Sequence, residues 1–151
     1  MAHGLTTPTT IMRALCIARH RFLSDHYCEV FSASDIVCSS VVGFEEGTRV
    51  ARDILPDVVL CDYDLLATAP LERWERDSGL MTIPILAVSL TRRPDEVEPG
   101  EASSIAGFLY LPTLSQADAS RLVRCAARRP VHAPSGALSW RLGAAEAQRH
   151  I

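Results

Sequence analysis

Several features that would assign this chain to a functional class are absent from its 151 residues. Its formal net charge is only −3, so no strong overall field would hold a nucleic acid or an anionic membrane surface. No apolar run approaches the roughly 20 residues of a membrane span, and the N-terminal sequence MAHGLTTPTTIMR lacks the charged start and long apolar core of a signal peptide. We therefore expect a cytoplasmic protein that binds neither membranes nor, by itself, nucleic acid.

Metal and cofactor motifs are also missing. The cysteines are odd in number and scattered, without a CxxC motif or a Cys/His spacing that suits zinc; they are Cys16, Cys28, Cys38, Cys61 and Cys125. Free cysteine is among the most buried residue types, so we expect these thiols to be reduced and mostly in the core. The sequence also lacks a Gly-rich phosphate loop after the first predicted strand, a nucleophile paired with a base, and a cofactor fingerprint. We therefore expect a protein that is not an enzyme and that binds no metal or cofactor.

What the chain does contain is a regular alternation of apolar segments and amphipathic segments. The apolar segments predict strands over residues 12–18, 36–42, 57–61, 83–90 and 107–111. Helical spacing predicts helices over residues 22–31, 44–55, 70–78 and 115–128, and it places Phe22, Leu55 and Ala117 on their inward faces. The segment 91–106 allows only a short or broken helix, because it contains Pro94, Pro99 and Gly100.

This alternation predicts an α/β fold. Strands that are apolar throughout and separated by helices require a parallel sheet covered on both faces, and right-handed crossovers then favour a flavodoxin-like, doubly wound sheet of five strands in the order 2-1-3-4-5. We expect an N-terminal tail over residues 1–10, one domain over 11–128, and a linker or tail over 129–151 that could form a short helix. Reactive groups should lie at the carboxyl ends of the strands.

Three motifs in this order resemble the receiver domain of bacterial two-component response regulators, over roughly residues 11–128. The segment PDVVLCD, residues 56–62, matches the family's third strand, which ends on the phosphoacceptor aspartate. Pro84 begins an apolar run that leads to Ser89, as in the family's fourth strand. Gly107, Phe108 and Pro112 stand in the register of the fifth strand.

The resemblance implies a mechanism that this chain supports only in part. In a working receiver the aspartate attacks a phosphoryl group, an acidic pair after the first strand holds Mg²⁺, and a lysine after the fifth strand adds a second positive charge. A hydroxyl on the fourth strand contacts the phosphoryl group, and an aromatic residue on the fifth reports the change. Asp62, Ser89 and Phe108 occupy the aspartate, hydroxyl and aromatic positions here.

The supporting residues depart from the family pattern. Ala18 and Arg19 (or Arg19 and His20, if the register shifts by one) replace the acidic pair, and neither choice offers a hard oxygen ligand for Mg²⁺. Leu111 replaces the lysine, Leu90 replaces a small residue after Ser89, and Leu66 replaces a proline. The altered pocket around the phosphoacceptor-equivalent Asp62 then comprises Ala18, Arg19, Asp64, Ser89, Leu90, Phe108, Leu111 and Pro112.

These departures favour a pseudo-receiver that has lost Mg²⁺-dependent phosphotransfer and acts in signal transduction by binding a protein. The resemblance implies a kinase, an output protein or a second copy of the chain as the partner, bound through the face formed by the fourth helix, fifth strand and fifth helix. One alternative is a response regulator that still accepts a phosphoryl group at Asp62 by a non-standard route, with Asp64 recruiting a cation. Another is a domain that binds a small anion or apolar molecule in a pocket lined by Arg19, Leu90 and Leu111.

Individual residues also allow more than one interpretation. Asp62 could be a plain strand-end carboxylate, or the guanidinium of Arg19 could take the place of the metal ion and pair with it. Ser89 could be a strand-end hydroxyl or a retained ligand contact. Phe108 is expected in the core, because it lacks the hydroxyl that would draw it outward. The resemblance also implies that a cis peptide bond could precede Pro112.

Overall fold

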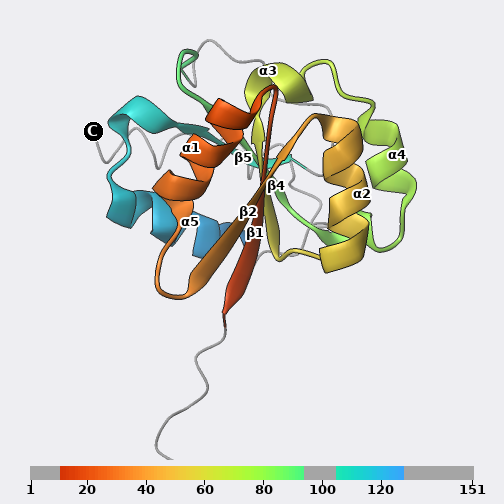
Figure 1. Cartoon of the computed structure of the whole chain (residues 1–151), viewed down its shortest axis with the longest axis horizontal. Coiled ribbons are helices and arrows are strands. Elements are labelled where there is room, and N and C mark those ends of the chain that lie inside the picture. Colours follow the sequence, from red (N-terminus) through yellow and green to blue (C-terminus); the bar gives the residue numbers. More distant parts are fainter. Residues whose placement is uncertain (1–10, 94–104, 128–151) are drawn as a thin grey trace, which may run out of the picture.

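Five parallel strands form one sheet in the order β2-β1-β3-β4-β5 (Figure 1). The computed structural model describes residues 11–93 and 105–127. The strands are β1 (Met12–Ala18), β2 (Ile36–Val42), β3 (Val58–Asp62), β4 (Ile85–Ser89) and β5 (Ile105–Tyr110). This arrangement confirms the predicted flavodoxin-like fold. The predicted tails 1–10 and 129–151, and most of the broken segment that contains Pro94, Pro99 and Gly100, lie outside the described residues.

Helices cover both faces of the sheet, with α1 and α5 on one side and α2 and α4 on the other (Figure 1). Their bounds are α1 (Arg21–Phe31), α2 (Phe44–Ile54), α3 (Tyr63–Leu66), α4 (Leu71–Arg76) and α5 (Gln116–Ala127). Two 3₁₀ turns, Leu80–Thr82 and Leu111–Thr113, precede β4 and follow β5. None of the described helices combines the length and the apolar character needed to cross a lipid bilayer.

Each face of the sheet has its own hydrophobic core. Tyr27 and Phe31 of α1 are fully buried on one face, and Phe44 and Trp74 are buried on the other, with their ring centroids 5.8 Å apart. All residues of β3 and β4 are buried, which explains why both read as continuous apolar runs. Gly47 allows α2 to approach β1 closely, since a Cβ atom there would lie 2.5 Å from Cδ1 of Ile17.

Three residues predicted to face inward are exposed instead. Phe22 lies in the first turn of α1 and is 80% exposed, because the buried face of that helix is centred on Leu23 and Tyr27. Leu55 adopts a left-handed conformation that ends α2 one residue earlier than predicted, and this turns its side chain into solvent. Ala117 is exposed because the buried residues of α5 begin at Ala119.

The short helix α3 was not predicted. Its four residues follow β3 directly, and only Leu66 is buried, so the segment lacks a periodic apolar stripe that would identify it in the sequence. The prediction that the cysteines are mostly core residues holds for Cys16 and Cys61, which are buried. Cys28 and Cys38 are half-buried and Cys125 is exposed; all five are free thiols.

Candidate functional site

The candidate site lies at the carboxyl edge of the sheet, where Asp62 ends β3. Asp62 is paired with Val88 of β4 and is only 2% exposed, so its carboxylate needs a partner from the protein. Ala18 ends the neighbouring strand β1 and is fully buried. Because Ile17 is paired with Cys61, the residue that follows β1 emerges beside Asp62.

That residue is Arg19, and it forms an ion pair with Asp62. Its Nε donates a hydrogen bond to Oδ2 of Asp62 at 2.5 Å, and its Nη2 lies 3.6 Å from Oδ2 of Asp64. The hydrogen bond with Asp62 raises the pKa of Arg19 above its usual value. The side chain of Arg19 is 50% exposed, so the guanidinium closes the site from the solvent side. The structure thus contains the Arg19–Asp62 contact that the sequence allowed as one of three interpretations.

A second arginine completes the site from the loop after β4. Nε of Arg92 donates to Oδ1 of Asp64 at 2.9 Å, and its guanidinium lies 5.9 Å from the ring centroid of Tyr63. Two aspartates are therefore held by two arginines, and the four formal charges cancel. The sequence analysis missed Arg92 and Tyr63, because the loop that brings Arg92 back to Asp64 leaves no periodic pattern.

Ser89 positions that loop. Its side chain is nearly fully buried, and its oxygen accepts hydrogen bonds from the backbone N–H of Thr91 at 3.2 Å and of Arg92 at 2.8 Å. Such a turn, closed by a side-chain hydroxyl, is a common use of serine after a strand. Of the two interpretations of Ser89, the structure agrees with the strand-end hydroxyl, which holds the loop after β4.

Of the remaining predicted pocket residues, two are buried in the core and two are exposed. Phe108 is fully buried, as expected, and packs edge-on against Tyr63 at 5.6 Å between ring centroids. Leu111 packs into the core beneath α1 and α5, whereas Leu90 is 38% exposed and Pro112 is exposed. All peptide bonds of the described residues are trans, including the one before Pro112, so the implied cis bond is wrong. Pro112 instead lies in the 3₁₀ turn, where its fixed φ is accommodated.

Tyr27 of α1 also belongs to the surroundings of this site, which no motif in the sequence indicated. Its hydroxyl is buried and has no hydrogen-bond partner among the described residues. Burial raises the pKa of this phenol, and the negative charge of Asp62 adds to the effect. The phenol is therefore neutral and lies within electrostatic range of the Arg19–Asp62 pair.

The donor set does not suit Mg²⁺. One oxygen of Asp62 already accepts a hydrogen bond from Arg19, and Ala18 and Arg19 supply no oxygen ligand from their side chains. All fifteen basic residues of the chain other than histidine are arginines, so no lysine elsewhere in the sequence replaces the one expected at Leu111. Within the part of the chain that the structure describes, no group of three or more His, Cys, Asp and Glu side chains could hold a metal ion.

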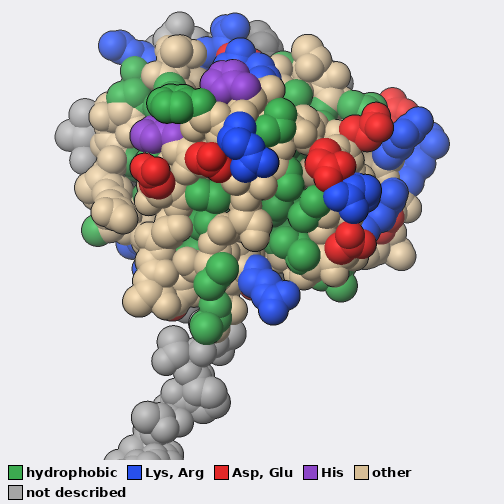
Figure 2. Space-filling model, in the orientation of Figure 1, with side chains coloured by type: hydrophobic (Ala, Val, Ile, Leu, Met, Phe, Trp, Pro, Cys, Tyr) green, Lys and Arg blue, Asp and Glu red, His purple; other side chains and the backbone are tan. Residues whose placement is uncertain are grey.

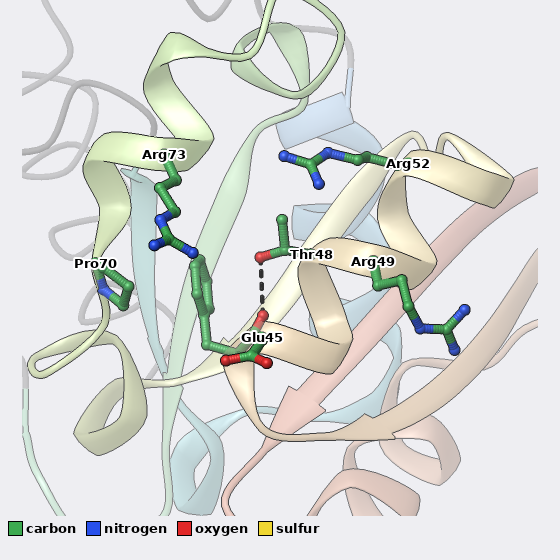
Figure 3. Close-up of a pocket in the computed structure, with 7 residues that line it drawn as sticks. Glu45, Thr48, Arg49, Arg52, Pro70 and Arg73 are labelled. Atoms are coloured by element: carbon green, nitrogen blue, oxygen red, sulfur yellow. Dashed lines mark hydrogen bonds between the residues drawn. The ribbon is translucent and has the colours of Figure 1, made fainter.

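Two cavities of the structure lie away from this site. One of about 260 Å³ lies between α2 and the start of α4, where Arg52 and Arg73 reach toward it from opposite sides (Figure 3). Nε of Arg52 also donates to Asp77 at 3.0 Å. A second, of about 440 Å³, is lined by Leu55, Pro56 and Pro84, among others. Neither is lined by Arg19, Leu90 or Leu111, the residues of the predicted ligand pocket.

Comparison with known proteins shows which solved structures have the same fold. The sequence matches no family model and no curated protein. The structure is similar to the chemotaxis response regulator CheY4 of Vibrio cholerae, with a TM-score of 0.62 and 15% identity, over 78% of this chain and 99% of that one. It is also similar to a CheY-like receiver domain from Methylobacillus flagellatus, with a TM-score of 0.62 and 14% identity over 77% and 98% of the two chains. A LuxR-family two-component response regulator from Aurantimonas sp. SI85-9A1 has a TM-score of 0.59 and 15% identity over 93% and 99%. The chain therefore has the fold of response-regulator receiver domains.

Proposed function

We propose that this chain is a cytoplasmic pseudo-receiver of bacterial signal transduction. It is not an enzyme, does not carry out Mg²⁺-dependent phosphotransfer, and acts by binding another protein. The observation that supports this proposal is the ion pair between Arg19 and Asp62, at 2.5 Å. It puts a fixed cation at the carboxylate that a receiver uses as its nucleophile.

Phosphotransfer to Asp62 would meet three obstacles. An incoming phosphoryl group would have to displace the guanidinium from Oδ2, and Mg²⁺ would have to bind beside two arginines that already neutralise Asp62 and Asp64. A second cation would also be needed to stabilise the transferred group, and Leu111 at the lysine position faces the core. All three obstacles arise from this chain's own side chains.

The same edge of the sheet offers a surface for a protein partner. Phe22 follows β1, Val42 ends β2 and Leu90 follows β4; their side chains are 80%, 38% and 38% exposed. Figure 2 shows apolar, acidic and basic side chains intermixed on the upper part of the molecule, where the strands end. Exposed aromatic and aliphatic groups beside paired charges are typical of protein contact surfaces. The segment between β4 and β5, where the resemblance implies the fourth helix of the family's interface, lies mostly outside the described residues.

The phosphotransfer claim is tested by adding beryllofluoride with Mg²⁺ to the labelled chain and recording amide NMR spectra. Beryllofluoride mimics an aspartyl phosphate, so a working receiver, measured alongside as the assay control, shows large shifts around its site. We expect no shift of Asp62, Tyr63 or Ser89 here, and no acyl phosphate after incubation with acetyl phosphate. A saturable, Mg²⁺-dependent shift at these residues would establish the alternative, a functional phosphoacceptor.

The contact claim is tested separately with Phe22→Ser. Because Phe22 is largely exposed, this substitution should leave the melting temperature unchanged while weakening binding to a partner identified by co-purification. Val37→Ser, which changes another exposed apolar residue on the edge strand β2, is the matched control. Equal binding by both variants and the unmodified chain would remove this surface from the proposal.

A further inference from the structure

Three of the five cysteines converge between α1 and the edge of the sheet. Cys16 lies on β1, Cys28 on α1 and Cys38 on β2, and all three belong to the core beneath α1. Each of the three thiols shifts the pKa of the other two, so the three side chains lie close to one another. Helix α1 is held over β2 at this place by a hydrogen bond from the hydroxyl of Ser40 to Asp25, at 2.6 Å. The cluster has no part in the site around Asp62.

Access to solvent distinguishes the three thiols. Cys16 is fully buried in the sheet, whereas Cys28 and Cys38 are half-buried, and Cys38 lies on the edge strand. Hydrogen bonds from the other two thiols lower the pKa of Cys38, and the same contacts raise the pKa of Cys16. Of the three, Cys38 therefore combines access with thiolate character, the two properties that make a cysteine reactive.

Strand geometry disfavours one of the three possible disulfide pairs. Cys16 is paired with Ser40, and Cys38 with Ala14, so these two cysteines lie on a diagonal two residues out of register. Strands about 4.8 Å apart with a rise of about 3.3 Å per residue put their Cα atoms about 8 Å apart. A disulfide requires Cα atoms within about 7 Å, so the rigid sheet disfavours a bond between Cys16 and Cys38. Cys28 lies on a helix above the sheet and is free of this restriction.

We propose that Cys28 and Cys38 form a reversible dithiol–disulfide pair that hydrogen peroxide oxidises. The thiolate of Cys38 attacks one peroxide oxygen, the O–O bond breaks, and hydroxide leaves, which after protonation gives a sulfenic acid and water. The sulfur of Cys28 then attacks the sulfenic sulfur, releases a second water and forms the disulfide. Two thiols are thus oxidised by two electrons while one peroxide is reduced to two waters, and a dithiol reductant reverses the change. The new bond ties α1 covalently to β2.

The proposal is tested on the full chain with all five cysteines present. Reduced protein is treated with hydrogen peroxide, alkylated and cleaved with trypsin, which leaves Cys28 and Cys38 together in the peptide 22–49. We expect this peptide to lose two hydrogen atoms and to resist alkylation, and cleavage after Glu29 to give two fragments that separate only after reduction. The extent of alkylation of buried Cys61 should be the same before and after peroxide treatment, which controls for unfolding.

Two variants identify the order of events. In Cys28→Ser the remaining neighbour is Cys16, which the sheet geometry disfavours as a partner, so dimedone should trap a sulfenic acid at Cys38. Cys125→Ser removes an exposed thiol on α5 that is not part of the cluster, and it should leave the disulfide yield unchanged. Full alkylation of Cys28 and Cys38 in peroxide-treated wild-type protein, or a disulfide that contains Cys16 instead, would overturn the proposal. Because the disulfide is mapped in wild-type protein, this test does not depend on whether the variants fold.

Discussion

Removing the guanidinium of Arg19 should destabilise the folded chain, because it leaves the buried carboxylate of Asp62 without its partner. A double-mutant cycle measures the free energy of this interaction. The cycle compares Arg19→Met, Asp62→Asn and the double variant with the unmodified chain. Methionine keeps much of the apolar stem of arginine and removes only the guanidinium, and asparagine keeps the shape of aspartate without its charge. The quantity of interest is the coupling free energy, which isolates the interaction between the two side chains.

The structure bounds this coupling. A hydrogen bond to a charged group contributes about 1.5–3 kcal/mol, and breaking a fully buried ion pair costs about 3–5 kcal/mol. The carboxylate of Asp62 is nearly fully buried, but the guanidinium of Arg19 is half exposed, so water can reach the carboxylate once the guanidinium is gone. We therefore expect a coupling of about 1–2 kcal/mol, at the low end of these ranges and above the roughly 0.2–1 kcal/mol of an exposed pair.

The assay is urea denaturation at neutral pH, followed by circular dichroism and repeated at high salt. A partly buried pair is screened less than an exposed one, so most of the coupling should persist in salt. Arg21→Met is the matched control, because Arg21 is largely exposed and lies 3.9 Å from Asp25; it should cost less than about 0.5 kcal/mol. If Arg19→Met costs no more than Arg21→Met, or if the coupling is indistinguishable from zero, Arg19 does not compensate the buried charge of Asp62.

Three further predictions concern stability elsewhere in the chain. Arg124 holds Asp35 with two hydrogen bonds of 2.7 and 2.8 Å and lowers its pKa, so the pair stabilises the folded state above roughly pH 3.9, the usual Asp value, and this contribution is lost as the pH falls through the lower folded-state pKa. The stability difference between wild type and Arg124→Gln should accordingly shrink on acidification. Tyr27→Phe should leave the free energy of unfolding unchanged or raise it by up to about 1 kcal/mol, because the phenol is buried without a partner among the described residues. Gly47→Ala should destabilise by about 1–3 kcal/mol, since its Cβ would meet Cδ1 of Ile17 at 2.5 Å; adding Ile17→Val should recover part of this loss.

Urea denaturation also measures these three effects, the first as a function of pH. A difference for Arg124→Gln that grows on acidification would contradict the assigned direction of the Asp35 pKa shift. A loss of more than about 1 kcal/mol in Tyr27→Phe would show that the hydroxyl has a partner in solution. A Gly47→Ala variant as stable as wild type would mean that Ile17 changes its side-chain conformation at little cost.

The sheet could be predicted from the sequence because its signals are local. A strand buried on both faces is a short continuous apolar run, and the runs ending at Asp62 and Ser89 are buried throughout in the structure. The prediction of buried residues failed near the ends of helices, where the exact helix boundary determines which side chains face the core. Phe22 fits the helical spacing, but it lies on the solvent side of the first turn of α1. Leu55 fits the same spacing, but the helix has already ended.

The site could be predicted only where strand order alone determines proximity. Arg19 follows β1 and Asp62 ends β3, so the order of the strands brings the two together without knowledge of any loop. Arg92 reaches Asp64 through a loop whose course depends on the hydroxyl of Ser89, and no pattern in the sequence describes that course. The buried face of a helix likewise shows that Tyr27 is inside, but not that its hydroxyl lies near a carboxylate.

The charge balance of the site links its substitutions to one another. A buried carboxylate must be compensated by a cation, and in a receiver the metal ion supplies that charge only when it binds. Here Arg19 and Arg92 supply two positive charges to the two negative charges of Asp62 and Asp64, all from the chain itself. A divalent ion would leave this balanced group with two uncompensated positive charges, and a lysine in place of Leu111 would add a third. Once Arg19 neutralises Asp62, an apolar residue at position 111 carries no electrostatic penalty, so the same charge compensation accounts for both Arg19 and Leu111 in the proposed pseudo-receiver.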